Sequence, residues 1–285
     1  KSSSQNVKPI QGFSGVLDIL VWPMAGLMYG IGKTVAFGYY GIVIVLATII
    51  VRTLAWPIYT KTNDLSLKMN IAAPEIDKIQ AKYAGKNDKE SQQRMQLELL
   101  NVYRKYGIGF GGCLLPFVQF PIFLAFYQTL QRIPLTRNGN YKLDFGFLNG
   151  NFLGIDLFKG RFDLVTKEPV GTKQTIGIIV LAVLVGLTQI ISQILTQKRQ
   201  KKAQEESQAN IPEYRRKQQT ETQKQTEMSM KIMVYTMTVM MVIFVLQSTA
   251  ALGLYWLVGN LYTMIQGYIS HKNSKKRLEK LRAKY

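Results

Sequence analysis

The sequence predicts an all-α membrane protein in which several helices cross the bilayer. Of its 285 residues, 47% are hydrophobic, and many of these lie in long runs that contain no acidic residue. The runs alternate with polar segments that carry most of the formal net charge of +19. A helix needs about 20 mostly apolar residues to cross about 30 Å of hydrocarbon, and several runs reach that length.

Five runs are predicted to span the membrane, and the last two are separated by so few residues that they predict a membrane helical hairpin. An earlier run, 14–36, is interrupted by Asp18, Pro23 and glycines, so it predicts an amphipathic helix on the membrane surface within the N-terminal region 1–38. The five predicted spans are 39–60, 113–133, 174–195, 229–247 and 250–269.

Basic residues are concentrated in three of the segments between or after these spans, namely 61–112, 196–228 and the tail 270–285. The segment 134–173 has a nearly balanced mixture of charges, and the turn near 248 has none. Because positively charged loops stay in the cytoplasm, the pattern predicts an N-terminus outside and a C-terminus inside. The basic segments then lie near anionic lipids, and no specific nucleic-acid partner is expected.

The segment 61–112 is predicted to form a charged helical hairpin in the cytoplasm. Apolar residues fall on one helical stripe in 74–83 and on another in 89–107, and the intervening "AGKND" predicts a turn. Pro74 is suited to the start of the first helix and Gly107 to the end of the second. The stripes contain Ile76, Ile79 and Tyr83, and then Met95, Leu99, Val102, Tyr103 and Tyr106.

The segment 196–227 has almost no apolar residue, so we expect mobile chain or frayed helix there.

The composition excludes most catalytic and metal chemistry. The chain has one cysteine, Cys113, and one histidine, His271, so no disulfide framework and no histidine or thiolate metal site is expected. No nucleotide-binding motif is present, and we expect neither a cofactor nor an enzymatic activity.

Arg52 stands inside the first predicted span, where an arginine costs roughly 2.5–3.5 kcal/mol at the bilayer centre on insertion scales. One interpretation is that its side chain snorkels toward the headgroups, since Thr60 is only about 12 Å of helix rise away. The other is that it faces a wet cavity. No predicted span contains an acidic residue that could neutralise the charge, which favours the cavity.

Several other polar side chains are predicted to share the inner leaflet with Arg52. Each alone fits a contact between helices, whereas together they could line a hydrophilic notch open to the cytoplasm. These residues are Gln119 in the second span; Thr188, Gln189, Ser192, Gln193 and Thr196 in the third; and Trp256, Asn260, Thr263 and Gln266 in the fifth.

Four stretches of the chain resemble the YidC-type membrane insertases, and they occur in that family's order. They are "WPIYTKTNDLSLKM", "PEIDKIQAKY", "YRKYGIGFGGCLLPFVQFPIFLAFYQTL" and "LGLYWLVGNLYTMIQGYI", and the likeness covers about residues 39–270. In one place the family's usual Asn-Pro is replaced by "GIGF". The resemblance implies a short, Gram-positive-like member in the bacterial cell membrane, with a signal peptide and lipidated cysteine before Lys1.

The resemblance also implies five spans around a groove that opens to cytoplasm and lipid but is closed on the outside. Arg52 matches the family's groove arginine, Gln189 or Gln193 a groove glutamine, and Trp256 a groove aromatic. The groove would receive nascent membrane proteins with acidic extracytoplasmic segments, alone or with the Sec translocon, the ribosome and the signal recognition particle pathway. The substrate-binding residues expected on this basis are Arg52, Gln119, Gln189, Ser192, Gln193, Trp256 and Asn260.

The alternative is a secondary transporter for a small anion, which would also place an arginine at mid-membrane. Such transporters are built from internal repeats with paired broken helices, and no repeat is found in this sequence.

Overall fold

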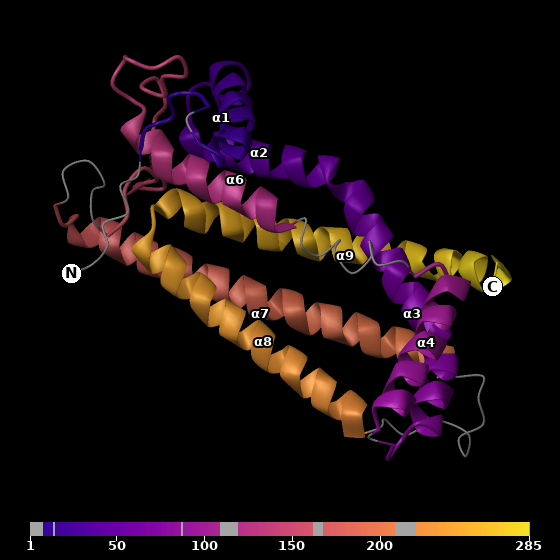
Figure 1. Cartoon of the computed structure of the whole chain (residues 1–285). Helices are drawn as coiled ribbons and strands as arrows, with labels where there is room; N and C mark the ends of the chain where they lie inside the picture. Colours follow the sequence, from indigo (N-terminus) through magenta and orange to yellow (C-terminus); the bar gives the residue numbers. More distant parts are fainter. Residues whose placement is uncertain are drawn as a thin grey trace. The chain divides into compact units, whose positions relative to one another are not determined.

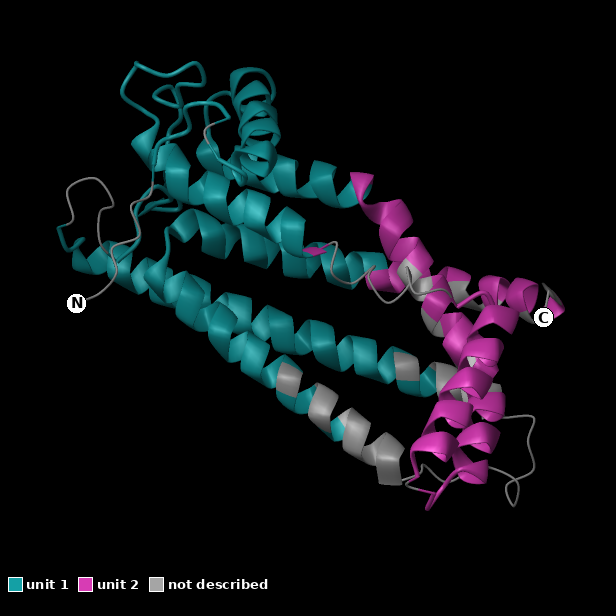
Figure 2. Ribbon diagram, viewed as in Figure 1, with its two compact units in different colours: residues 1–53, 120–266 teal, residues 54–119, 267–285 magenta. Residues whose placement is uncertain are grey.

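The computed structural model describes residues 8–13, 15–86, 88–108, 119–161, 168–208 and 221–284. The described part is mainly α-helical, which confirms the predicted all-α membrane class at that level (Figure 1). The chain forms two compact units, Lys1–Thr53 with Phe120–Gln266 and Leu54–Gln119 with Gly267–Tyr285 (Figure 2).

The elements are labelled as in Figure 1. They are α1 (Asp18–Lys33), α2 (Tyr40–Leu54), α3 (Trp56–Lys82), α4 (Lys89–Lys105), α6 (Gln119–Arg132), the 3-10 turn η2 (Ile133–Leu135), β1 (Asn151–Phe152), β2 (Ile155–Asp156), α7 (Thr172–Gln208), α8 (Glu221–Gln247) and α9 (Ala250–Lys284).

One helical stretch of the described residues, Thr172–Arg199 in α7, is by itself long and apolar enough to cross a membrane. It contains the third predicted span and exceeds it at both ends. Two further stretches, Tyr40–Leu54 and Val234–Gln247, are apolar but shorter. The second predicted span lies partly outside the described residues.

The segment expected to be mobile or frayed is helical at both of its ends, because α7 continues to Gln208 and α8 begins at Glu221. Its middle lies outside the described residues. The short turn expected between the last two predicted spans is present, since α8 and α9 are separated only by Ser248 and Thr249, and α8 packs along α7. That both helices span the membrane stays a prediction.

The stretch expected as the first span is divided between two helices, because α2 stops at Leu54 and α3 begins at Trp56. Where the span itself ends stays a prediction. Pro57 lies in the first turn of α3, where a missing backbone N–H costs nothing. The prediction that Pro74 begins a helix is wrong, since Pro74 lies inside α3. Pro57 and Pro74 are both compatible with the first turn of a helix, and the helix begins at Trp56, just before Pro57, and continues through Pro74.

In the second unit, α3 and α4 pack as the predicted helical hairpin. Their interface is a small apolar cluster of Ala72, Val102, Tyr106 and Ile108, against which the predicted stripe residues Ile76, Ile79 and Tyr103 also pack. The turn between the helices contains Gly85 with φ +80°, and Gly107 with φ +61° follows α4, as expected of a helix end.

Ion pairs add to this hairpin. Lys105 Nζ and the Tyr106 hydroxyl donate to Glu75 Oε1 at 2.6 and 2.8 Å, and Lys82 pairs with Glu98 at 2.6 Å. The hydrogen bond from Lys105 is the main reason that the pKa of the Glu75 carboxyl lies below its usual value. The pair therefore stabilises the hairpin at neutral pH and loses its effect as the pH falls through that lowered pKa.

In the first unit, one face of α1 packs into the main apolar core. Val21, Met24, Ala25, Met28 and Ile31 are buried at the spacing of one helical stripe. The predicted helix is therefore confirmed, while its position on the membrane surface stays a prediction.

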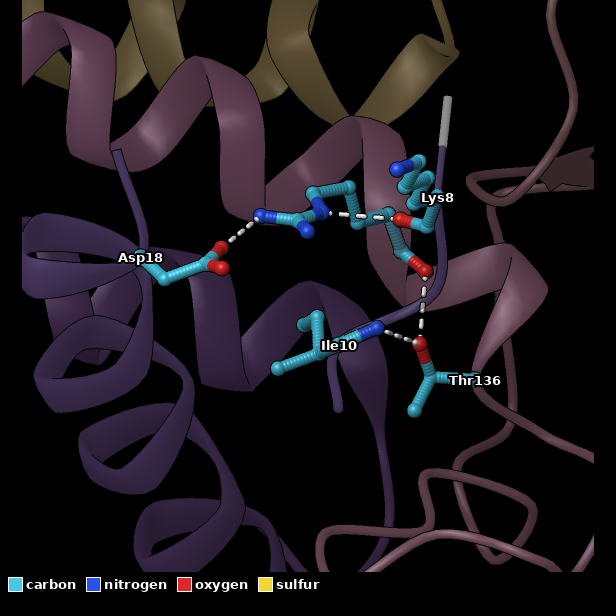
Figure 3. Close-up of polar contacts among 5 residues, drawn as sticks. Lys8, Ile10, Asp18 and Thr136 are labelled. Carbon is cyan, nitrogen blue, oxygen red and sulfur yellow. Dashed lines mark hydrogen bonds and ion pairs between the residues drawn. The ribbon is translucent and has the colours of Figure 1, made fainter. Parts of the chain in front are cut away.

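Asp18 does not interrupt this helix but begins it, and its carboxylate is buried against α6 (Figure 3). Arg132 Nη1 donates to Asp18 Oδ1 at 2.5 Å, and the two side chains are only 9% and 5% exposed. Arg132 Nε donates to the Lys8 carbonyl at 2.8 Å, and the Ile10 amide donates to Thr136 Oγ1 at 3.0 Å (Figure 3). These bonds tie the N-terminal segment and α1 to the end of α6.

The segment after α6, expected only as a loop, is folded in its described residues 133–161. Phe145, Leu148, Leu157 and Phe158 are buried in the main core, and β1 pairs with β2 as a short antiparallel hairpin. The amides of Ala250 and Ala251 at the start of α9 donate to the carbonyls of Lys159 and Leu157 at 3.0 and 3.1 Å. The loop thus satisfies the otherwise unpaired first turn of α9.

We expect Asp18→Asn to destabilise the protein strongly, because it would leave the buried Arg132 guanidinium without its charge partner. Breaking a buried pair in this way costs about 3–5 kcal/mol. The measurement is the thermal unfolding midpoint of the purified protein in detergent.

The matched control is Glu90→Gln, which breaks the exposed pair between Glu90 and Arg94 in α4. Exposed pairs contribute only about 0–1 kcal/mol, so this variant should unfold near the parent midpoint. Equal midpoints for Asp18→Asn and Glu90→Gln would show that the buried pair does not hold α1.

Candidate functional site

Arg52 lies in the last turn of α2, and its side chain is held against α9 within the first unit. Its Nη1 donates to Thr263 Oγ1 at 2.8 Å, and its guanidinium carbon lies 6.0 Å from the centre of the Tyr262 ring. Gly259 lets the arginine approach the helix, because a Cβ at that position would lie 3.0 Å from Arg52 Nη2. A side chain that only snorkelled would extend away from the protein, whereas this one lies against a neighbouring helix.

The charge of Arg52 has no carboxylate partner among the residues that the structure describes. Its Nε is buried and has no hydrogen-bond partner in that part of the chain. The nearby groups are the hydroxyls of Thr263 and Tyr255 and the aromatic face of Tyr262, which stabilise a cation without neutralising it. Arg132 differs, since its guanidinium is paired with Asp18.

Asn260 lies on a different face of α9 and connects that helix to α7. Its Nδ2 donates to Thr188 Oγ1 at 3.1 Å and to the Val185 carbonyl at 3.3 Å, and the residue is 7% exposed. Gly259 and Thr263 face α2, whereas Asn260 is rotated about 100° from Gly259 toward α7. Asn260 therefore acts as a polar contact between helices.

Gln189, Ser192 and Gln193 share one face of α7. Both glutamines are half-buried and Ser192 is buried. They follow Thr188, which is the partner of Asn260, so they continue along α7 from the point where α7 and α9 are joined.

Gln119 is exposed at the first residue of α6 and belongs to the second unit. Its place beside the other predicted site residues stays a prediction.

Trp256 is part of an aromatic cluster formed by α6, α8 and α9. Its ring stacks on Phe123 with centroids 5.6 Å apart and an angle of 2° between the planes. Phe244 meets Trp256 edge-on at 6.4 Å, and Tyr127 meets Phe244 edge-on at 6.3 Å. Trp256 is thus held directly by two rings, Phe123 and Phe244, which fix its orientation.

Sequence reasoning missed most of these partners. It named Thr263 only as a polar residue of the same leaflet and did not single out Tyr262, Phe123 or Phe244. The spacing of Phe123 and Tyr127, four residues apart on one helical face, was the available signal for an aromatic contact.

Within the described residues there is no cluster of three or more metal-ligating side chains. The polar groups of the site are a guanidinium, hydroxyls and amides, which bind by charge and hydrogen bonds and supply no nucleophile activated by a base.

Fold and site together define an all-α membrane protein with an arginine that lies between helices and has no carboxylate partner in the described part of the chain. The family model described as 60Kd inner membrane protein matches residues 32–277, and the chain belongs to this family, the YidC/Oxa1 family. The family expected from the sequence motifs is therefore confirmed.

Curated relatives cover most of the chain. "Membrane protein insertase MisCA" of Bacillus subtilis (strain 168) is 26% identical over 251 residues, which is 88% of this chain and 77% of the relative. "Membrane protein insertase MisCB" of the same organism is 28% identical over 268 residues, or 91% and 82%. "Membrane protein insertase YidC" of Alkalihalophilus pseudofirmus (strain ATCC BAA-2126 / JCM 17055 / OF4) is 27% identical over 253 residues, or 88% and 79%.

We expect Asn260→Ala to weaken the contact between α9 and α7, because Thr188 would lose its donor. Hydrogen bonds between membrane helices contribute about 0.6 kcal/mol on average and up to about 1.7 kcal/mol. The free energy of unfolding in detergent should fall by a value in that range.

Asn273→Ala is the matched control, since it makes the same change at an exposed position of the same helix. It should shift the unfolding free energy by less than about 0.5 kcal/mol. If the two variants were equally stable, Asn260 would not be a contact between helices that contributes to stability.

Proposed function

We propose that the chain guides small or single-span membrane proteins from the cytoplasm into the bilayer through a positively charged groove in the inner leaflet. Its family membership makes it a membrane protein insertase of the bacterial membrane rather than an enzyme. The proposed groove lies among five spans and is lined by Arg52, Gln119, Gln189, Ser192, Gln193, Trp256 and Asn260. Family membership also favours this function over the alternative, a transporter for a small anion.

The observation that carries the proposal is the state of Arg52, a cation held against α9 by Thr263 and Tyr262 without a carboxylate partner among the described residues. Such a charge remains available to an incoming acidic segment. Two unit charges 4 Å apart interact by roughly 4 kcal/mol at an effective dielectric constant of 20. The attraction would offset part of the cost of moving a hydrophilic segment into the membrane.

The remaining driving forces come from the substrate and the membrane. An apolar span that leaves the groove sideways gains about 25 cal/mol for each Å² of apolar surface removed from water. The membrane potential, positive outside, moves an acidic segment outward with about 2.3 kcal/mol per charge per 100 mV. These terms need no nucleotide and no metal.

The α3–α4 hairpin and the basic segments would provide the cytoplasmic contacts. The hairpin forms its own small core and carries exposed charged residues, which suits a surface that meets a nascent chain or the signal recognition particle pathway. The basic ends would contact anionic lipids or the ribosome. We also propose that the chain inserts its substrates either alone or together with the Sec translocon.

The proposed topology has an outside N-terminus and an inside C-terminus. Single cysteines at Lys86, Lys202 and Gly139, introduced after Cys113→Ser, test it with a label that does not cross membranes. In intact cells the label should react at Gly139 and not at Lys86 or Lys202. Reaction at Lys86 from outside would overturn the arrangement.

The second experiment tests whether Arg52 acts through its charge. Arg52→Lys should keep much of the insertion of a single-span substrate with an acidic outer segment, whereas Arg52→Ala should lose it at least tenfold. Removing the substrate's acidic residues should shrink the defect of Arg52→Ala, because both changes then act on one interaction. The measurement is protease protection of the substrate after insertion into vesicles.

Arg94→Ala, which removes an exposed positive charge from α4, should insert both substrates as the parent does. If Arg52→Ala failed equally on acidic and neutral substrates, the arginine would act by holding water in the groove and not by attracting the substrate. Normal insertion by Arg52→Ala would show that the charge of Arg52 has no part in insertion.

A further inference from the structure

The short hairpin β1–β2 is wedged between the first turns of two helices of the first unit. Phe152 and Ile155 form a cross-strand pair. A Cβ at Gly41 of α2 would lie 2.6 Å from the Phe152 ring, and a Cβ at Gly177 of α7 would lie 2.6 Å from Ile155 Cγ1. Each helix therefore has a glycine where the hairpin approaches, and only a glycine allows that distance.

Further bonds fix the hairpin at this level of α7. The Asp156 amide donates to Gln174 Oε1 at 2.8 Å, and Gln174 Nε2 donates to the Asp156 carbonyl at 2.8 Å. Gly177 follows Thr172, where the apolar stretch of α7 begins, by roughly 7–8 Å of helix rise. If α7 crosses the membrane, the hairpin lies beside the first turns of a span and not above it.

The residue at the tip of this hairpin is a leucine in an unfavourable backbone conformation. Leu153 has φ +53° and is 89% exposed. Glycine or asparagine is the usual residue for this conformation, which costs free energy in any other side chain. An exposed leucine gains nothing from the protein that would offset the cost.

A second turn also has an exposed apolar residue at a positive φ. Phe37, between α1 and α2, has φ +47° and is 83% exposed. It precedes Gly38, whose carbonyl accepts from the Asn149 amide at 2.7 Å, so the turn is bonded to the segment that leads into β1. Single exposed apolar residues are common on proteins, but two at strained positions in connected turns call for a surface that receives them.

The exposed face of α7 beside the hairpin indicates what kind of surface receives Leu153 and Phe37. Next to the hairpin, α7 exposes Ile176, Ile179 and Val180 along its first turns. Lys173 lies beside the tip, because a Cβ at Gly154 would be 3.3 Å from its Nζ. Apolar side chains with a lysine at the start of a span are the pattern of the boundary between acyl chains and lipid headgroups.

We propose that Leu153 and Phe37 are lipid anchors that insert into the membrane boundary at the α7 N-terminal end. The anchors hold the β1–β2 hairpin between α2 and α7, so that lipid and protein together close this end of the unit. The inference rests on α7 as a membrane span and not on the Arg52 groove.

The test measures the depth of spin labels in nanodiscs of phosphatidylglycerol and phosphatidylethanolamine. Labels are attached to Leu153→Cys, Phe37→Cys and, as the matched control, Asn140→Cys, each in a Cys113→Ser background. Asn140 is an exposed polar position of the segment that contains the hairpin. The labels at 153 and 37 should collide more with oxygen than with a water-soluble nickel complex, with a ratio several-fold above that at 140.

Equal ratios at 153, 37 and 140 would overturn the proposal, since the anchors would then stand in water. A label at 153 shielded from both reagents would also overturn it, because the tip would be buried against protein. Leu153→Asn is the folding control and should keep or raise the parent unfolding midpoint in detergent, because asparagine tolerates the positive φ of this turn. A large loss would mean that the leucine serves protein packing. Substrate insertion by Arg52 variants is measured separately, so failure of the groove and failure of the anchors are distinguishable.

Discussion

The cost of placing an arginine away from water governs the arrangement of the first unit, and the chain meets that cost in two ways. Arg132 is neutralised by a buried carboxylate and by the carbonyl of Lys8, and it becomes a structural joint between α1, α6 and the N-terminal segment. In the described part of the chain, Arg52 receives from α9 the hydroxyls of Thr263 and Tyr255 and the aromatic face of Tyr262, and no carboxylate. The paired charge of Arg132 holds elements of the fold together, whereas a charge without a carboxylate partner, such as that of Arg52 in the described residues, can bind an anionic segment.

The helix α9 connects these requirements, because its faces make different contacts. One face receives Arg52 at Gly259 and Thr263, another binds α7 through Asn260, and Trp256 joins the aromatic cluster with α6 and α8. A helix with such contacts on several sides has little freedom to rotate. The fixed α9 therefore holds the Arg52 guanidinium in one place.

The helical parts of this fold were predictable because their signals are local. Long apolar runs predicted helices in α2, α7, α8 and α9, and the stripes at Ile76 and Val102 predicted the α3–α4 interface. Other features depend on residues far apart in the sequence, and periodicity carries no information about them. Asp18 and Arg132 are 114 positions apart, so Asp18 read as an interruption of a helix that it begins. The β1–β2 hairpin was missed because its strands are two residues long. The site residues named from the sequence, Arg52 and Trp256 among them, stay a prediction, and the sequence could not assign Asn260 to its contact with α7.

The bonds between the loop carbonyls of Leu157 and Lys159 and the first amides of α9 have a consequence for how the chain is made. Synthesis proceeds from the N-terminus, so the loop leaves the ribosome before α8 and α9 do. The carbonyls of Leu157 and Lys159 are therefore made before the Ala250 and Ala251 amides that bond to them. The start of α9 therefore completes the bonding of the loop, and a nascent chain that stops before Ala250 leaves the two carbonyls without these amides. A membrane protein that assists the assembly of others thus has a last step of its own, the docking of a turn onto a segment made earlier.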